Sequence, residues 1–206
     1  IWQADEIAEA QGYGMEEGQE KLRDVNGDGR YTPEDRVILG STNPDWSGSL
    51  FTTFKYKNID LSASMITNQG VLVYSNFHSN FGNVMDRGRQ KLDINWYIPE
   101  NDAGLPAQTS NTYPEAGNAG SFWRNDGVGY YRDASFVKVK NIALGYTFNN
   151  DVLDKLKLKN LRVYANVLNP FVFTDYEGYD PEWASASLNT GRPSWVTYQL
   201  GFNLKF

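Results

Sequence analysis

The nine residues from 198 to 206 alternate strictly between apolar and polar side chains. The apolar set is Tyr198, Leu200, Phe202, Leu204 and Phe206, and the polar set is Gln199, Gly201, Asn203 and Lys205. Successive side chains of a β-strand point to opposite faces, whereas a helix with 3.6 residues per turn would mix the two sets. The period of two therefore predicts a strand with one apolar face, in a sheet whose two sides differ chemically.

Shorter stretches of the same alternation predict further strands. They cover residues 50–56, 59–65, 71–74 (as an extension of the second stretch), 141–148 and 161–167. Lys57-Asn58 supplies the turn of a hairpin between the first two. The fold class predicted from these patterns is all-β and antiparallel.

Two regions lack this alternation. Residues 76–132 show little periodicity but hold many aromatic side chains. Irregular segments of this length are unusual inside a compact domain, and disordered segments are poor in aromatics, so we expect long, ordered loops. Residues 4–10 are good helix formers and predict one short helix, and residues 37–40 predict a single further turn.

Composition excludes several classes of function. The 206 residues carry 19 Lys+Arg against 25 Asp+Glu, and this net charge of −6 argues against a nucleic-acid binder. The absence of cysteine excludes disulfides, thiolate catalysis and Cys-ligated metals within this sequence. Apolar runs such as Val71-Leu72-Val73 are far shorter than the roughly 20 residues of a spanning helix. An aromatic content of 15% is nevertheless high for so polar a chain.

Two architectures fit the alternation. In a soluble β-sandwich the apolar side of each strand faces a core. In a transmembrane β-barrel it faces lipid, aromatic side chains gather near strand ends, and short turns alternate with long loops. The residues alone leave both open.

The segment 24–35 has the spacing of a calcium-binding loop. Such a loop offers oxygen ligands from positions 1, 3, 5, 7, 9 and 12 and has glycine at position 6. The ligand positions hold Asp24, Asn26, Asp28, Arg30 (through its backbone carbonyl), Thr32 (through a water) and Asp35, with Gly29 at position 6. Asp35 stands where a bidentate Glu is usual, which lowers the expected affinity. We expect a structural calcium site, the alternative being an Asx-rich turn with solvated carboxylates.

Taken in order, several segments resemble the C-terminal part of a SusC/RagA-type TonB-linked outer-membrane transporter. They are residues 24–40, 43–48, 56–62, 96–100, 134–148, 160–164 and 178–182, and the strand that ends at Phe206. The resemblance implies the C-terminal portion of a large antiparallel transmembrane barrel of about 22 strands. On this basis, residues 1–45 form an extracellular loop region with the calcium-type loop, and residues 46–206 form barrel strands with long loops. The N-terminal plug domain and the remaining strands are expected outside this sequence.

The resemblance also implies a role and partners. The role is TonB-energised import of a nutrient, such as a glycan, an oligosaccharide or a peptide, across the bacterial outer membrane. The partners are a SusD-like surface lipoprotein, the rest of the barrel and plug, TonB and outer-membrane lipid. The residues expected to face the polar lumen are Arg162, Tyr164, Asn166, Gln199, Asn203 and Lys205. The terminal set Tyr198, Leu200, Phe202, Leu204 and Phe206 resembles the signal read by the barrel assembly machinery.

Loop aromatics are the candidates for contact with substrate or lid. They are Trp96, Tyr97, Trp123, Tyr130 and Tyr131. The alternative is that these rings pack loop against loop. No residue set points to catalysis, so we do not expect an enzyme. The alternative function is that of a soluble, calcium-stapled β-sandwich module that binds carbohydrate through the same aromatics.

Overall fold

A computed structural model describes residues 1–82, 92–100, 104–184 and 194–206. It contains two compact units, each built from two stretches of the chain. One unit, here the loop unit, comprises residues 1–39 and 74–132, and the other, the sheet unit, comprises residues 40–73 and 133–206.

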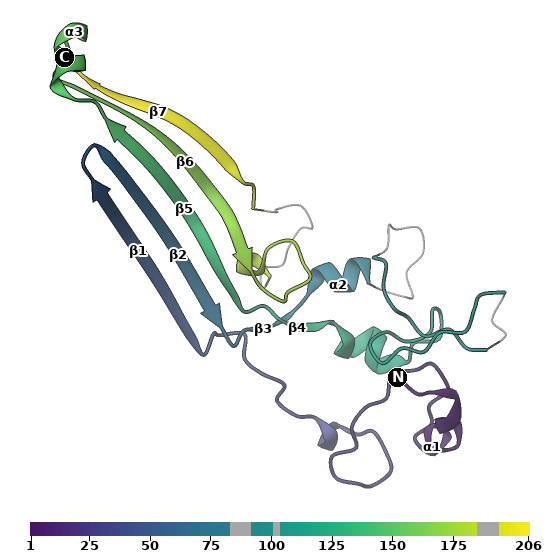
Figure 1. The fold of residues 1–206 in the computed structure, drawn as a ribbon. Coiled ribbons are helices and arrows are strands. Elements are labelled where there is room, and N and C mark those ends of the chain that lie inside the picture. Colours follow the sequence, from purple (N-terminus) through teal and green to yellow (C-terminus); the bar gives the residue numbers. More distant parts are fainter. Residues whose placement is uncertain (83–91, 101–103, 185–193) are drawn as a thin grey trace. The chain divides into compact units, whose positions relative to one another are not determined.

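The sheet unit is built on five long antiparallel strands. They are β1 (Trp46–Tyr56), β2 (Ile59–Gln69), β5 (Phe136–Thr147), β6 (Asn160–Phe173) and β7 (Thr197–Lys205). They lie side by side in the order β1-β2-β5-β6-β7 (Figure 1). A separate two-stranded sheet consists of β3 (Leu72–Tyr74) and β4 (Tyr131–Asp133). The predicted all-β antiparallel class is confirmed.

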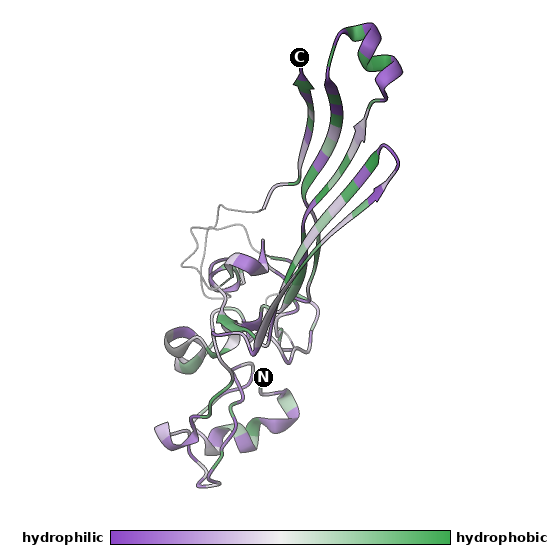
Figure 2. Cartoon of the chain, turned by 90° about the vertical axis from the view of Figure 1, so that its left-hand side faces the viewer, coloured by the Kyte–Doolittle hydropathy of each residue, from purple (hydrophilic) through white to green (hydrophobic). Residues whose placement is uncertain are grey.

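The strand register aligns apolar side chains into rows that cross the whole sheet. In one such row Phe54 pairs with Leu61, Leu61 with Leu144, Leu144 with Ala165, and Ala165 with Leu200. Most of these side chains stay exposed: Phe54 is 63% and Leu200 86% accessible. Apolar and polar residues accordingly follow one another along the strands in Figure 2. Within the described residues, nothing covers this apolar face.

The buried core of the sheet unit lies beside the strands rather than on that face. It is a cluster formed by Val71, Val73, Ala134, Tyr176 and Ala184. A sandwich would instead bury the apolar faces of its strands between two sheets.

The strands are longer than the alternation predicted, and one is placed differently. β5 begins at Phe136 rather than 141, and its register with β6 shifts between Val139 and Asn141. Such a bulge hides the earlier part of the strand from a simple period of two. The expected extension of β2 through 71–74 is wrong, because Gly70 (φ 74°) interrupts the chain and β3 pairs elsewhere.

The connection between β5 and β6 contains a helix that the sequence patterns did not predict. Helix α3 (Asn150–Leu156) ends at Lys157, whose φ is +55°, and buries Leu153. It lies at the same end of the sheet as the β1–β2 turn and the C-terminal residue (Figure 1). A second short element, the 3-10 turn η5 (Pro181–Trp183), lies between β6 and β7 in the chain.

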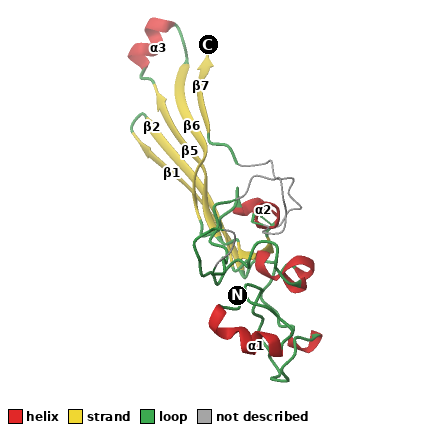
Figure 3. Ribbon diagram, turned by 90° about the vertical axis from the view of Figure 1, so that its right-hand side faces the viewer, coloured by secondary structure: helices red, strands yellow, loops and turns green. Residues whose placement is uncertain are grey.

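The loop unit holds short helices between ordered loops (Figure 3). They are η1 (Ala4–Glu6), α1 (Ile7–Gly12), η2 (Pro33–Asp35), α2 (Asn76–Phe81), η3 (Phe122–Asp126) and η4 (Val128–Tyr130). The predicted helix at the start of the chain is confirmed. The turn predicted at 37–40 is wrong: residues 37–40 form no helical turn, and the turn forms at Pro33, whose fixed φ suits a first helical position. No helix in the described ranges has the length and apolarity needed to cross a membrane.

Two aromatic clusters stabilise the loop unit. Trp2, Ala10 and Met15 form one with Tyr13 and Tyr31. The other consists of Tyr113, Ala119, Trp123 and Tyr130, with Ile94 and Trp96 packed against it. The expectation of ordered rather than disordered loops holds for the described part of 76–132.

Candidate functional site

The six residues predicted to face a lumen all lie on one face of the sheet, opposite the apolar rows. Arg162 pairs with Asn203, Tyr164 with Gly201, and Asn166 with Gln199. The amide of Asn166 donates to Gln199 Oε1 at 2.9 Å. Lys205 pairs with Asn160, two residues before Arg162, so it shares their side of the sheet. The structure thus places the six together, and their exposure to a lumen remains a prediction.

An ion pair crosses this polar face over a glycine. Arg162 on β6 donates to both carboxylate oxygens of Asp60 on β2, with Nε 3.0 Å from Oδ1. Gly145 on β5 lies between them, and a Cβ there would stand 2.3 Å from Arg162 Nη2 and 2.6 Å from Asp60 Oδ1. The missing side chain is what lets two strands that are not neighbours join. No local sequence pattern indicates this pair, because it depends on the strand order β2-β5-β6.

Tyr164 covers a second glycine of the polar face, Gly201. Its ring lies over Gly201, where a Cβ would be 2.5 Å from the ring, and the Arg162 guanidinium is 5.2 Å from the ring centroid. The face therefore combines one neutralised ion pair with amide and phenol groups and the ammonium group of Lys205.

At the end of the sheet away from the Asp60–Arg162 pair, a buried lysine joins β5 to the segment around η5. Lys138 of β5 is fully buried and donates to Asp180 Oδ2 at 2.6 Å, Glu182 Oε2 at 2.8 Å and Ser194 Oγ at 2.9 Å. Lys140 reaches Glu182 from solvent at 3.0 Å. No local sequence pattern indicates this cluster, because its members come from segments more than 40 residues apart.

The cluster shifts the pKa values of its carboxyl groups. Burial acts to raise the pKa of Asp180, but hydrogen bonds from Lys138, Ser194 and the Glu182 N–H outweigh it and hold the pKa below its usual range. The pKa of Glu182 is lowered in the same way, with burial opposed by Lys138 and Lys140. Both carboxylates therefore stabilise the folded state only while they are ionised.

The predicted calcium loop is closed by hydrogen bonds from its own backbone. Asp24 accepts from the N–H groups of Gly27 (2.6 Å) and Gly29 (2.8 Å). Asp35 accepts from Thr32 and Val25, each at 2.8 Å. The Thr32 and Val25 bonds outweigh a small burial effect and lower the pKa of Asp35. The loop is thus an ordered turn in its own right.

The donor chemistry of this loop suits calcium, but its carboxylates are not gathered as a cation site. Asp28 bonds to the Arg30 N–H (2.9 Å), as Asp24 and Asp35 bond to other loop amides. Within the described ranges, no group of three or more His, Cys, Asp or Glu side chains is placed to hold a metal. Each carboxylate keeps unused lone pairs. Coordination by Asn26, Thr32 and the Arg30 carbonyl stays a prediction.

Two tyrosines connect the loop to the aromatic cluster at the start of the chain. Tyr31, inside the loop, stacks on Tyr13 at 4.6 Å between ring centroids. Tyr13 donates to Asp24 Oδ2 at 3.2 Å, and Tyr31 donates to the Leu22 carbonyl at 3.0 Å. Burial raises the pKa of Tyr31 to about 12, so its hydroxyl remains a donor at neutral pH.

Three of the five aromatic contact candidates are buried within the loop unit. Tyr97, Trp123 and Tyr130 are each 4% accessible. Tyr97 donates to Glu17 at 2.7 Å and Trp123 donates to the Tyr130 hydroxyl at 3.1 Å. These three rings pack loop against loop. Trp96 is half-buried beside them and Tyr131 is 39% accessible, so contact with a substrate or lid stays a prediction chiefly for these two.

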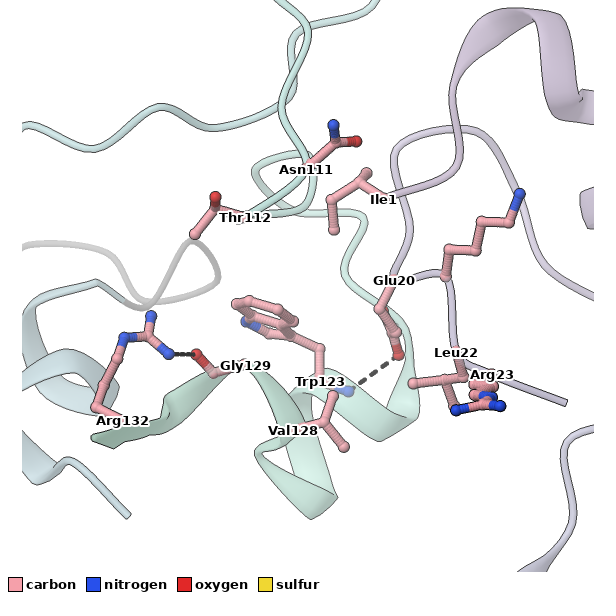
Figure 4. Close-up of a pocket in the computed structure, with 11 residues that line it drawn as sticks. Ile1, Glu20, Leu22, Arg23, Asn111, Thr112, Trp123, Val128, Gly129 and Arg132 are labelled. Carbon is pink, nitrogen blue, oxygen red and sulfur yellow. Dashed lines mark hydrogen bonds between the residues drawn. The ribbon is translucent and has the colours of Figure 1, made fainter. Parts of the chain in front are cut away.

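A cavity of about 390 Å³ opens beside Trp123 in the loop unit (Figure 4). The buried Glu20 carboxylate lies at its wall and accepts from the N–H groups of Gly120 (2.7 Å) and Trp123 (2.9 Å). Arg132 is held by the Gly129 carbonyl at 2.6 Å. Glu20 and Arg132 are therefore committed to internal bonds, which indicates a structural role for these two side chains.

Curated proteins similar in sequence to this chain are TonB-dependent receptors. No protein-family model matches the chain. The TonB-dependent receptor SusC of Bacteroides thetaiotaomicron is 34% identical over 187 residues, 89% of this chain and 17% of SusC. The TonB-dependent receptor P39 of Formosa agariphila is 30% identical over 204 residues, 90% of this chain and 18% of P39. The chain thus spans less than a fifth of the length of either relative.

Solved structures share the fold. The RagAB peptide transporter aligns with a TM-score of 0.68 at 22% identity, over 90% of this chain and 20% of that one. The RagAB peptide importer in its closed-closed state aligns with a TM-score of 0.64. The sheet and these likenesses define the class: the chain corresponds to part of a TonB-dependent β-barrel transporter of the bacterial outer membrane. Within that class it is homologous to a segment of the SusC/RagA-type transporters.

Removing the buried lysine should destabilise the sheet unit. Lys138→Met leaves Asp180 buried without its cation, and breaking a buried pair from one side costs about 3–5 kcal/mol. The exposed Lys140→Met control should cost about 0–1 kcal/mol. Unfolding in detergent, followed by loss of heat-modifiable gel mobility, measures both.

The same pair of variants has a pH signature. The lowered pKa values of Asp180 and Glu182 mean that their contribution is complete above an ordinary carboxyl pKa of about 4. It is lost as pH falls through the lowered folded-state values. The difference in the free energy of unfolding between wild type and Lys138→Met should therefore become smaller only at acid pH. Equal stability of wild type and Lys138→Met at pH 7 contradicts the assignment.

Proposed function

We propose that this chain supplies part of the wall and outer loops of an importer that moves a polar nutrient across the outer membrane with energy from TonB. One observation carries the proposal: five paired strands present an uncovered apolar face on one side and a polar face on the other. Homology to SusC and P39 supports it. A soluble sandwich module fits less well, because it needs a partner sheet over the apolar rows.

In this function the two faces have different tasks. The apolar rows contact lipid, and the polar face contacts the water-filled interior. The ion pair between Asp60 and Arg162 neutralises itself, so a solute meets the amides and phenol of Asn166, Gln199 and Tyr164. It also meets the lysines of the polar face, Lys55 and Lys205. Such groups suit a hydroxyl-rich or peptide-like solute and provide no reacting group. We expect no catalysis.

The remaining parts of the proposal concern partners. A SusD-like lipoprotein would cover the outer end, and TonB would act through parts of the transporter beyond this chain. The RagAB comparisons favour a peptide, while the SusC relative is named only as a TonB-dependent receptor. The substrate is therefore proposed as a glycan, an oligosaccharide or a peptide.

Single cysteines distinguish the two faces of the wall. The chain has no native cysteine, so each introduced thiol is a unique probe within it. Gln199→Cys and Asn203→Cys should react with a charged, water-soluble maleimide in the folded transporter. The neighbours Leu200→Cys and Phe202→Cys should resist it at least about tenfold more and instead react with a lipid-soluble reagent. Equal labelling of adjacent positions contradicts a lipid-facing wall.

Growth experiments test the transport function itself. Deletion of the encoding gene should abolish growth on one nutrient class, supplied as oligosaccharides or as peptides, and spare growth on the free sugars or amino acids. Loss of TonB should give the same defect. A deletion strain that grows normally on both classes would argue against import, even if the cysteine labelling confirms the wall.

The loop at 24–35 is proposed as a structural calcium site that holds the loop unit in place. The support is the order of its oxygen donors and the two tyrosines that attach it to the cluster around Trp2. Calcium would share the lone pairs left free by the backbone hydrogen bonds. Coordination would add to the backbone hydrogen bonds that close the turn.

Terbium luminescence offers a direct test of the calcium site. Tyr31 lies within the loop, so excitation of tyrosine should sensitise a bound terbium ion, and calcium should displace it. Asp24→Asn with Asp28→Asn should reduce the signal at least about tenfold, because calcium-type sites depend on ligand charge. Asp151→Asn with Asp154→Asn, in α3, is the matched control. A signal that survives the loop substitutions places the ion elsewhere.

A further inference from the structure

One end of the five-stranded sheet carries the two short connections between neighbouring strands, β1–β2 and β5–β6. The β1–β2 turn at Lys57-Asn58, helix α3 and the end of β7 lie there together (Figure 1). The Asn58 carbonyl accepts from the Thr147 N–H at 2.8 Å, and the Lys159 N–H donates to the Lys205 carbonyl at 2.7 Å. Outer-membrane barrels have short turns on the periplasmic side and long loops outside. This end therefore faces the periplasm.

Four exposed lysines, here called the lysine rim, surround this end. They are Lys57, Lys155, Lys157 and Lys159. Within the described residues, none of the four takes part in a salt bridge. The acidic side chains nearby in sequence are Asp60, which is paired with Arg162, and Asp151 and Asp154 on α3, both exposed, so positive charge prevails.

The lysine rim continues directly from the lipid-facing rows. Lys57 Nζ lies 5.4 Å from the ring centroid of Tyr56, which is 59% accessible and pairs with Ile59 of the apolar face. Ile59 in turn pairs with Tyr146, and Tyr146 meets Phe148 edge to face at 5.1 Å. Exposed aromatics at this level mark the boundary between hydrocarbon and headgroups.

Helix α3 adds an apolar contact to the same boundary. Leu153 is buried and fixes the helix, whereas Val152 and Leu156, one turn apart, are 37% and 53% accessible. A helix with exposed apolar residues beside lysines is suited to lie in the headgroup region. Its lysine stems can cover apolar surface while their ammonium groups stay at the phosphates.

We propose that the lysine rim and α3 bind the phosphate groups of anionic phospholipids in the inner leaflet of the outer membrane. The other lysines at this end, Lys55 and Lys205, belong to the polar face and are not part of the site. The inference depends on the outer-membrane location and not on the nutrient transported.

The expected size of the effect follows from surface electrostatics. Each lysine close to an anionic membrane surface raises affinity about fivefold at ordinary salt. Because the two aspartates of α3 offset part of this gain, we expect the intact rim to favour an anionic lipid over a neutral one by at least about tenfold. Higher salt should reduce that preference.

The test uses the full-length protein in neutral phosphatidylcholine micelles titrated with phosphatidylglycerol, with thermal stabilisation as the readout. The wild type should be stabilised by phosphatidylglycerol in 50 mM but not in 500 mM salt. The variant K57Q/K155Q/K157Q/K159Q should need at least about tenfold more lipid. The same four positions changed to arginine should keep the wild-type response, which shows that charge and not local folding is lost.

The control substitutes the two polar-face lysines, K55Q/K205Q, and should titrate as the wild type does. Val152→Ser with Leu156→Ser should weaken the binding of both phosphatidylcholine and phosphatidylglycerol. The ratio of the two affinities should not change. The proposal is overturned if the rim variant titrates normally, or if the control loses as much. A response to lipid A that exceeds the response to phosphatidylglycerol would also overturn it, since that lipid belongs to the outer leaflet.

Discussion

The antiparallel register of the five strands decides which chemical environment each side chain meets. Because the pairing of Leu61, Leu144 and Leu200 with their partners fixes one face as apolar, the alternate residues must form the polar face. Which side chains meet lipid, the water-filled interior or the headgroups depends on this single alignment. The buried core around Val73 and Tyr176 lies beside the strands, so it stabilises the connecting segments and not the face of the sheet.

Polar residues on the sheet are satisfied across strands rather than within them. Asp60 and Arg162 meet over β5, and Lys138 collects Asp180 and Glu182 from a segment more than 40 residues away. The side chains of Arg162 and Asp60 are 27% and 22% accessible, whereas Lys138 and Asp180 are buried. The first pair removes charge from the proposed interior, and the buried cluster fixes the segment around η5 to the end of the sheet.

Sequence alone predicted the parts that depend on local pattern. The alternation from Tyr198 to Phe206 corresponds to β7 almost residue for residue, and the hairpin turn at Lys57-Asn58 forms as expected. The start of β5 was missed because a bulge changes the phase at Val139. The Lys138 cluster and the pair over Gly145 were missed because they need a strand order that no local pattern contains. The donor spacing of the 24–35 loop was readable, but the hydrogen bonds that occupy its carboxylates were not.

The glycine at position 145 also bears on assembly. If β5 slipped by one residue against its neighbours, Leu144 or Tyr146 would stand beneath the bridge between Asp60 and Arg162, and the bridge would not close. Only the native alignment presents a position without a side chain. The ion pair therefore forms only in the native register. It stabilises the correct placement of β5 between β2 and β6, two strands that are far apart in the chain.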